Sequence, residues 1–394
     1  MVADPSFAHR YRTQNLAEEW VRLGHRVTII AGTYSHLHTQ EVPGDESIVE
    51  TECNGVQYLH LRAAIYRGSG LGRVKNILAY ALLSRKMERL VHSKGPYDLV
   101  ISGTVYQIDN FSARRLALES RCPWIRETRD LWPLTLHEIG GMSKIHPFAR
   151  WVQMGEDLAC RHADLVVSTL PGAFEHLKTR GLTEDRFRWS PQAANPVSPD
   201  PAPLPSEHYE LLDSLRENGR IIGVMAGGLV PAINLPLLLE AAPMAASAGV
   251  DVVIVGSGEL EDLARKATGK NVHLLPRIHQ AAMPSLLASV DFGISGSQNL
   301  NLYRYGVSPN KVTEYMASGL PVVLSVPCAK NLVEDAQAGF VTGAESPEQL
   351  ASGMIKLAAM SQVERLAMGK KGKQYIEANA SISTIARQYL NWIN

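Results

Sequence analysis

The chain has 394 residues, which is more than one hydrophobic core usually needs, so two domains are expected. Its 39 basic and 39 acidic residues cancel, which argues against a protein that binds nucleic acid. The four cysteines form no metal-ligand or disulfide pattern, and the sequence contains neither a secretory signal nor an apolar run of membrane-spanning length, so a cytoplasmic protein without a bound metal is expected.

The first predicted elements are a helix that ends at Gly24 and a strand from Arg26 to Ala31. A doubly wound α/β domain normally opens with a buried strand ahead of its first helix. Residues 1–5 are too short and too polar to form that strand. The sequence therefore predicts that the first strand of this domain is missing, through a mis-set start at Met1 or a truncation, and that two neighbouring strands are left unpaired.

A basic stretch with helical periodicity follows, between Arg62 and Lys94. It holds eight Lys or Arg residues against one acidic residue, and apolar residues recur in it at helical spacing. Such a helix can lie on an anionic membrane, or it can pack its apolar face on the core and leave its charges in water. Arg73 and Lys75 of this stretch, with Arg12 of the first helix, are assigned to the acceptor or membrane side.

The strand from Pro123 to Glu127 runs into a charged turn that contains Arg129 and Asp130. Open α/β sheets bind their ligands at the carboxyl ends of their strands, where these two residues are expected. A charged pair in a turn is also common in an ordinary solvated loop. Both interpretations stay open at this stage.

The second half begins after a segment that is half proline, from Pro196 to Pro205, which indicates an interdomain linker. A strand from Ile221 to Ala226 then ends at Gly227 and Gly228. Two adjacent glycines after a strand let the backbone come close to a phosphate, although the pattern alone is a weak signal.

The stretch YRYGVSPNKVTEYMASGLPVVLS, residues 303–325, predicts a ligand-binding corner. Ser308 is predicted to be the N-cap of a short helix, whose positive end would suit a phosphate together with Lys311. Glu314, one turn further along, could accept hydrogen bonds from the two hydroxyls of a ribose. The alternative is an ordinary capped helix with a solvated Lys and Glu.

The run SPNKVTEYMASGLPVV resembles the donor site of the family 4 retaining glycosyltransferases, in the bacterial surface-polysaccharide branch that includes N-acetylfucosamine transferases. In that family two glutamates eight positions apart hold the donor. Glu314 matches the second, which binds the ribose, whereas the first position is Gly306. The resemblance also makes Ser308, Asn310 and Lys311 donor-binding residues.

The resemblance extends to the loops around the expected site. It implies that Gly227, Gly228 and the backbone near Ile278 also contact the nucleotide sugar. The motif RDLWP resembles the catalytic loop of this branch. Arg129 cannot lose its proton, so it would hold a phosphate of the leaving group, and Asp130 would orient or deprotonate the acceptor hydroxyl.

These inferences predict an α/β fold with GT-B architecture, in which two Rossmann-like domains face each other across a cleft. The N-terminal acceptor-side domain would span residues 1–196 and be completed by a C-terminal helix at 376–394, and the nucleotide-sugar domain would span 197–375. The expected activity is transfer of a hexosyl or N-acetylhexosaminyl group from a nucleotide sugar, UDP-linked by preference, to a hydroxyl of a polyprenyl-diphosphate-linked saccharide.

No cofactor beyond the nucleotide sugar and no metal is expected, and the enzyme would work in the cytoplasm, at the inner membrane face. Two other classes stay open. One is a sugar-nucleotide epimerase, which the sparse carboxylates disfavour, and the other is a non-catalytic GT-B protein that binds a nucleotide or a partner.

Overall fold

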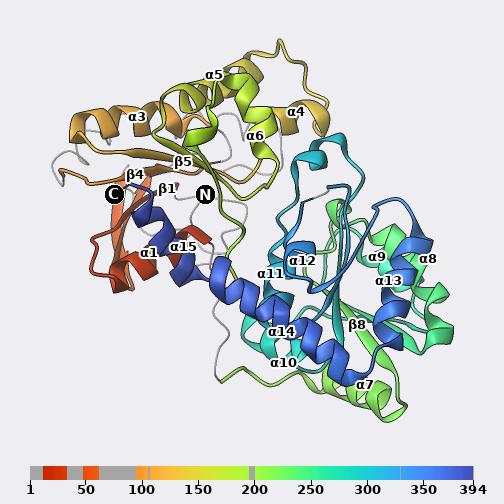
Figure 1. Ribbon diagram of the computed structural model, residues 1–394. Coiled ribbons are helices and arrows are strands. Elements are labelled where there is room, and N and C mark those ends of the chain that lie inside the picture. Colours follow the sequence, from red (N-terminus) through yellow and green to blue (C-terminus); the bar gives the residue numbers. More distant parts are fainter. Residues whose placement is uncertain are drawn as a thin grey trace. The chain divides into compact units, whose positions relative to one another are not determined.

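The computed structural model divides the chain into two compact units (Figure 1). Unit 1 comprises Met1–Ser190 and Ile382–Asn394, and unit 2 comprises Pro191–Ser381. The unit boundary therefore precedes the proline-rich segment, and the returning C-terminal segment begins at residue 382 rather than at 376. The structure describes residues 12–32, 48–61, 95–104, 107–194, 200–328 and 330–393.

Unit 2 is built on a six-stranded parallel sheet with the strand order β10-β9-β8-β11-β12-β13. Counted along the chain from β8, this is the order 3-2-1-4-5-6 of the Rossmann fold, in which the direction of winding reverses between the first and the fourth strand. That switch point lies between β8 and β11. The strands are β8 (Ile221–Ala226), β9 (Val250–Val255), β10 (Val272–Leu275), β11 (Phe292–Gly296), β12 (Val322–Ser325) and β13 (Gly339–Thr342).

Helices cover both faces of this sheet, which explains why its strands are apolar on both sides. One face packs against α8 (Leu235–Met244), α9 (Glu261–Lys266) and α13 (Pro347–Ala359). The other face carries five helices: α7 (Ser206–Glu217), α10 (Met283–Leu287), α11 (Asn310–Ala317), α12 (Leu332–Asp335) and α14 (Gln362–Asn379).

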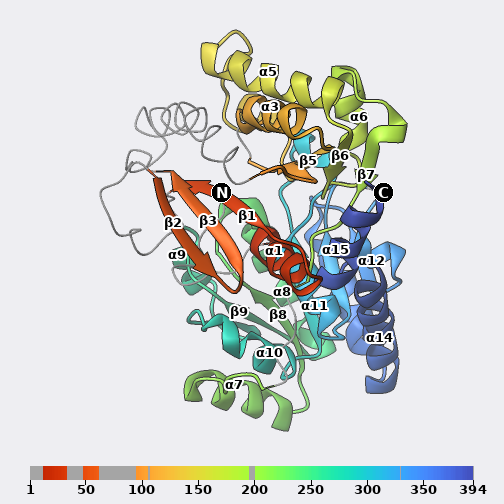
Figure 2. The ribbon, with the colours of Figure 1, turned by 90° about the vertical axis from the view of Figure 1, so that its left-hand side faces the viewer.

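The described strands of unit 1 form two separate sheets (Figure 2). In one, β3 (Val56–Leu61) lies between β1 (Thr28–Gly32) and the antiparallel β2 (Ile48–Cys53). The other is parallel, in the order β4-β5-β6-β7. Among the described strands, β1 pairs only with β3, and β4 pairs only with β5. The parallel strands are β4 (Val100–Ser102), β5 (Trp124–Thr128), β6 (Leu165–Ser168) and β7 (Phe187–Trp189).

The C-terminal helix α15 (Ile382–Asn391) packs against α1 (Arg12–Arg22) within unit 1. The indole of Trp20 donates a hydrogen bond to the carbonyl oxygen of Ala386 at 3.0 Å. The last helix thus returns to the N-terminal unit. The other described α-helices of this unit are α3 (Asp109–Ser120), α4 (Leu134–Glu138), α5 (Pro147–His162) and α6 (Ala173–Leu177).

In the described part of the chain, no helix combines the length and the apolar character that crossing a bilayer requires. The basic stretch with Arg73 and Lys75 lies outside the described residues, so its assignment to the acceptor or membrane side stays a prediction.

Candidate functional site

The helix α11 is fixed at the switch point of unit 2 by one buried tyrosine. The backbone N–H of Ala226, the last residue of β8, donates a hydrogen bond of 2.9 Å to the hydroxyl oxygen of Tyr315. The ring of Tyr315 fits over β11 because residue 293 is glycine, where a Cβ would lie 2.2 Å from the ring. The N-terminal turn of α11 is thereby held beside the end of β8, where Rossmann-type sheets bind their ligands.

Lys311 reaches the glycine turn that follows β8. A Cβ placed on Gly227 would lie 3.6 Å from Nζ of Lys311, and Gly227 has a φ of 127°, which a residue with a side chain rarely adopts. Lys311 is half-buried, and its ammonium makes no hydrogen bond or ion pair with the described residues. Burial lowers its pKa to about 8, although the charge of Glu314 acts in the opposite direction. Lys311 and the glycine turn, both predicted to contact the donor, therefore lie close together.

The prediction that Ser308 caps this helix is wrong. The N-cap is Pro309, which makes no side-chain capping hydrogen bond. The N–H of Val312 donates to the carbonyl oxygen of Pro309 at 3.1 Å, which leaves the N–H groups of Asn310 and Lys311 for a ligand. Asn310 is exposed in that first turn, and Ser308 and Glu314 are half-buried nearby in the sequence.

Gly306, at the position where the resemblance expects the first glutamate, has a backbone conformation that favours glycine. The residue is buried and has a φ of 111°, a conformation that a residue with a side chain rarely adopts. A glutamate at this position would require a different loop conformation.

Two further predicted donor contacts lie at the same end of the unit 2 sheet. Gly228 is exposed directly after Gly227. Ile278 follows β10 and packs against the hydrophobic cluster that contains Tyr315 and Val312 of α11. Both positions are compatible with a nucleotide at the carboxyl ends of the strands, and their contacts with the nucleotide stay predictions.

In unit 1, Arg129 and Asp130 follow the carboxyl end of β5, as predicted. Arg129 is anchored, since its Nη2 donates to the carbonyl oxygen of Gly103 at 2.8 Å and its Nε lies 3.5 Å from Oε1 of Glu127. Asp130 reaches solvent, yet the protein around it desolvates its carboxyl group and raises its pKa, while the charge of Arg129 acts in the opposite direction. A raised pKa suits a group that exchanges a proton with a substrate.

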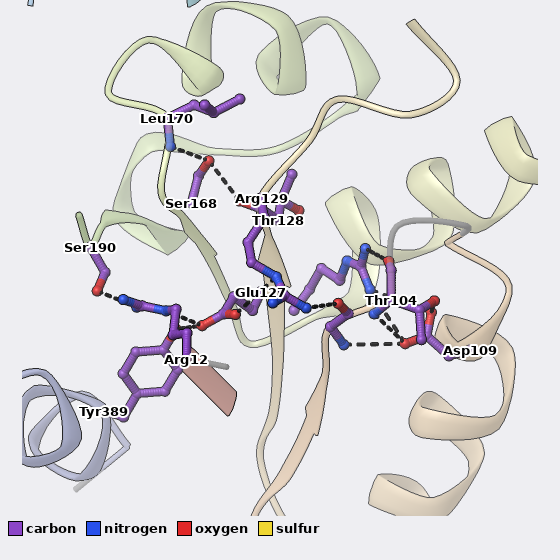
Figure 3. A network of polar contacts seen from close by, with 12 residues as sticks. Arg12, Thr104, Asp109, Glu127, Thr128, Arg129, Ser168, Leu170, Ser190 and Tyr389 are labelled. Carbon is purple, nitrogen blue, oxygen red and sulfur yellow. Dashed lines mark hydrogen bonds and ion pairs between the residues drawn. The ribbon is translucent and has the colours of Figure 1, made fainter. Parts of the chain in front are cut away.

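Glu127 is a central residue of this region that the sequence argument missed (Figure 3). Its buried carboxylate accepts hydrogen bonds from Arg12 Nε, at 3.1 Å, and from the hydroxyl of Tyr389 on α15. Burial alone would raise the pKa of Glu127, but the charges of Arg12 and Arg129 outweigh this effect and lower it to about 2. One available signal was the pair of charged residues, Arg126 and Glu127, inside an apolar strand.

The assignment of Arg12 to an acceptor- or membrane-facing surface is wrong. Arg12 is 3% exposed, and besides its bond to Glu127 its Nη2 donates to Oγ of Ser190 at 2.8 Å. Figure 3 shows Arg12 directed at Glu127, next to Tyr389. Because the guanidinium is buried among these partners, Arg12 has a structural role that joins the two ends of unit 1.

Unit 2 has a parallel sheet of order 3-2-1-4-5-6, with a cationic helix start at its switch point, and unit 1 is a second α/β unit. This combination is of the GT-B type. Family models agree with this class: residues 8–191 match the glycosyl transferase 4-like domain, and residues 220–360 match glycosyl transferases group 1. The chain therefore carries a glycosyl transferase 4-like domain followed by a glycosyl transferases group 1 domain, which makes it a glycosyltransferase. None of the curated proteins compared matches this chain.

Solved structures with the same fold include several glycosyltransferases. Sucrose-phosphate synthase from Thermosynechococcus elongatus has a TM-score of 0.66 at 16% identity, over 96% of this chain and 91% of that chain. WaaG, a glycosyltransferase involved in lipopolysaccharide biosynthesis, has a TM-score of 0.63 at 16% identity, over 98% of this chain and 97% of that chain. HepE from Anabaena, in complex with UDP-glucose, has a TM-score of 0.57 at 17% identity, over 84% of this chain and 85% of that chain. At these identities the likeness shows the GT-B fold.

Proposed function

We propose that this glycosyltransferase is a retaining enzyme that moves a sugar from UDP to a hydroxyl of a polyprenyl-diphosphate-linked saccharide in surface polysaccharide biosynthesis. The UDP-glucose bound by HepE and the lipopolysaccharide role of WaaG support the donor and the acceptor class. The resemblance of residues 308–323 to the donor site of that branch supports the same choice.

One observation carries the proposal: Lys311 is an ammonium without a described ion-pair partner, held beside the glycine turn at the switch point. A half-buried cation is costly unless an anion compensates it. A diphosphate bound between Lys311, the uncapped start of α11 and the backbone at Gly227 would supply that anion. Glu314 would then accept hydrogen bonds from the ribose hydroxyls, and the backbone near Ile278 would meet the uracil.

The transfer can be written without a metal ion. The bond between the anomeric carbon and the diphosphate oxygen breaks, and its electron pair leaves with UDP. For retention, the acceptor oxygen forms the new bond to the anomeric carbon on the face from which UDP departs. Its proton passes to the departing diphosphate, and Asp130 would orient the acceptor hydroxyl. Lys311 stabilises the charge that develops on the diphosphate.

The first experiment is a calorimetric titration of the full chain with UDP, GDP and ADP. We expect UDP to bind, and Lys311→Met to bind it about tenfold to a hundredfold more weakly, the range of one charge-assisted hydrogen bond. Binding of none of the three nucleotides would refute the proposal.

Radiolabelled transfer from a panel of UDP-sugars onto polyprenyl-diphosphate-linked saccharides then identifies the substrates. The anomeric configuration of the product, read by NMR, tests retention, and an inverted product would contradict that part of the proposal.

A second candidate, a non-catalytic nucleotide-binding protein, is favoured by Gly306. This residue stands where the family's sugar-binding glutamate is expected, and its conformation does not suit a glutamate. The two candidates differ in turnover. UDP binding without release of sugar from any donor in the panel would favour the second.

A further inference from the structure

The two oxygens of the buried Glu127 carboxylate have different partners. Oε2 accepts hydrogen bonds from Arg12 Nε, at 3.1 Å, and from the hydroxyl of Tyr389. Oε1 lies 3.5 Å from Nε of Arg129, in the turn after β5 (Figure 3). Glu127 therefore links the first and the last helix of unit 1 to the turn that carries Arg129 and Asp130.

Packing holds the ring of Tyr389 in place independently of its hydroxyl. The side chain is fully buried on α15 and packs against Trp20 and Trp392, with ring centroids 5.8 and 5.2 Å away. Burial raises the pKa of Tyr389 well above its ordinary value, so the hydroxyl keeps its proton and donates a hydrogen bond to Glu127. This bond therefore orients the carboxylate, while the aromatic contacts hold the helix.

Arg129 is held at two points. Its Nη2 donates to the carbonyl oxygen of Gly103 at 2.8 Å, and its Nε faces Oε1 of Glu127. Because a guanidinium is planar and its donors have fixed directions, these two contacts together set its plane. The side chain of Arg129 is 22% exposed, so the loss of one contact would let it turn towards solvent.

Asp130, the next residue, depends on the charge of Arg129. The surrounding protein raises the pKa of the Asp130 carboxyl group, and the charge of Arg129 acts in the opposite direction. Arg126, the other arginine at this end of β5, is paired with Asp109 at 3.4 Å. The placement of Arg129 thus affects how readily Asp130 ionises, and an ionised carboxylate accepts a hydrogen bond from a hydroxyl.

We propose that Glu127 and Tyr389 are positioning residues, which hold Arg129 beside Asp130 while sugar is transferred. The inference rests on the proposed function, because Asp130 is assigned there to the acceptor hydroxyl. Neither positioning residue needs to touch a substrate. The last helix of the chain thereby acts on the reaction through a carboxylate 262 positions away.

The first test is Tyr389→Phe, which keeps the ring and the charge of Glu127 and removes the hydroxyl. We expect kcat to fall about tenfold, the scale of one hydrogen bond, and both the KM for the UDP-sugar and the affinity for UDP to stay unchanged. The matched control is Tyr375→Phe on α14, which removes a hydroxyl that is hydrogen-bonded to Asp335 and should leave kcat unchanged. An unchanged kcat in Tyr389→Phe would overturn the proposal.

A double-mutant cycle separates positioning from a general structural role. If Tyr389 acts through Arg129, Tyr389→Phe should cause no further loss of kcat in an Arg129→Met background. A purely structural role would give the same loss in both backgrounds, and that result would also overturn the proposal.

A third measurement does not need turnover. The pKa of Asp130 is read by NMR of protein labelled with ¹³C-aspartate, with Asp130→Asn to assign the signal. We expect a higher pKa in Tyr389→Phe than in the unsubstituted chain and in Tyr375→Phe, since a displaced Arg129 no longer lowers it. An unchanged pKa would contradict the positioning role. If the unsubstituted chain transfers no sugar while this pKa moves as expected, the proposed function fails and the link from Tyr389 to Asp130 stands.

Discussion

Replacing Lys311 with methionine should stabilise the protein and weaken UDP binding at the same time. Burial lowers the pKa of Lys311 from 10.5 to about 8. At about 1.4 kcal/mol for each pH unit by which a pKa moves, the folded state loses roughly 3 kcal/mol by keeping this ammonium charged. Methionine has a similar length and carries no charge, so Lys311→Met should gain up to about that amount in the free energy of unfolding at pH 7.

The destabilisation by Lys311 should depend on pH in a defined direction. Below pH 8 the lysine is charged in both the folded and the unfolded state, and the full destabilisation is present. Between pH 8 and 10.5 the folded state releases the proton while the unfolded state keeps it, so the unsubstituted protein becomes more stable relative to the methionine variant. Urea denaturation at about pH 7 and about pH 10, followed by hydrogen exchange of β8 and α11, measures the difference.

Ligand binding should follow the same titration. The affinity of the unsubstituted chain for UDP should fall as pH rises above about 8, and that of Lys311→Met should not. Uridine, which lacks the diphosphate, should bind both proteins alike. Lys373→Met, on the exposed side of α14, serves as the control. A destabilised Lys311→Met variant, or equal losses for UDP and uridine, would refute the assignment of Lys311 to the diphosphate.

Three other substitutions test the ribose contact of Glu314, the buried network around Glu127 and the packing of Tyr315 on Gly293. Glu314→Gln should weaken UDP and uridine binding by about 1 to 3 kcal/mol in calorimetric titrations, since a ribose contact is shared by both ligands, and unchanged heats would count against that contact. Glu127→Gln should lower the free energy of unfolding by roughly 3 kcal/mol, because it leaves a buried guanidinium uncompensated, whereas Glu119→Gln in an exposed pair should change it by less than about 1 kcal/mol. Because the pKa of Glu127 is lowered to about 2, its stabilisation should be present above about pH 4.5 and decline as pH falls towards 2, which acid titration of both variants can follow. Gly293→Ala should cost about 1 to 3 kcal/mol in chemical denaturation, because its Cβ would meet the ring of Tyr315, and an unchanged midpoint would show that the ring can move aside.

The parts of the site that depend on local signals could be predicted from the amino-acid sequence. Proline after a helix and glycine after a strand are local signals, so the helix at Lys311 and the turn at Gly227 both follow from the order of residues alone. Their proximity is a finding of the structure, because the winding of a parallel α/β sheet brings these two segments to one edge. The error at Ser308 was local too, because the chain enters α11 one residue later and Pro309 takes the N-cap position.

The network around Glu127 could not be predicted in this way. Its partners Arg12 and Tyr389 lie 115 and 262 positions away in the sequence, on the first and the last helix of unit 1. A periodic pattern shows which face of a helix is apolar, but it does not show which carboxylate a buried arginine will meet. The same limit applies to Arg12, which was assigned to the acceptor or membrane side and is buried in this network instead.

Gly306 bears on the choice between an active transferase and a nucleotide-binding protein. A glutamate forced into its backbone conformation would cost about 1 to 3 kcal/mol, so the loop as it stands favours glycine at this position. At the glycine turn, by contrast, the desolvated cation of Lys311 is present. Both candidates therefore predict UDP binding, and they differ only in the sugar. An enzyme that recognises its donor without that carboxylate must gain affinity from other contacts, so one UDP-sugar should bind more tightly than UDP, whereas a protein that has lost sugar recognition should bind UDP and every UDP-sugar with the same affinity.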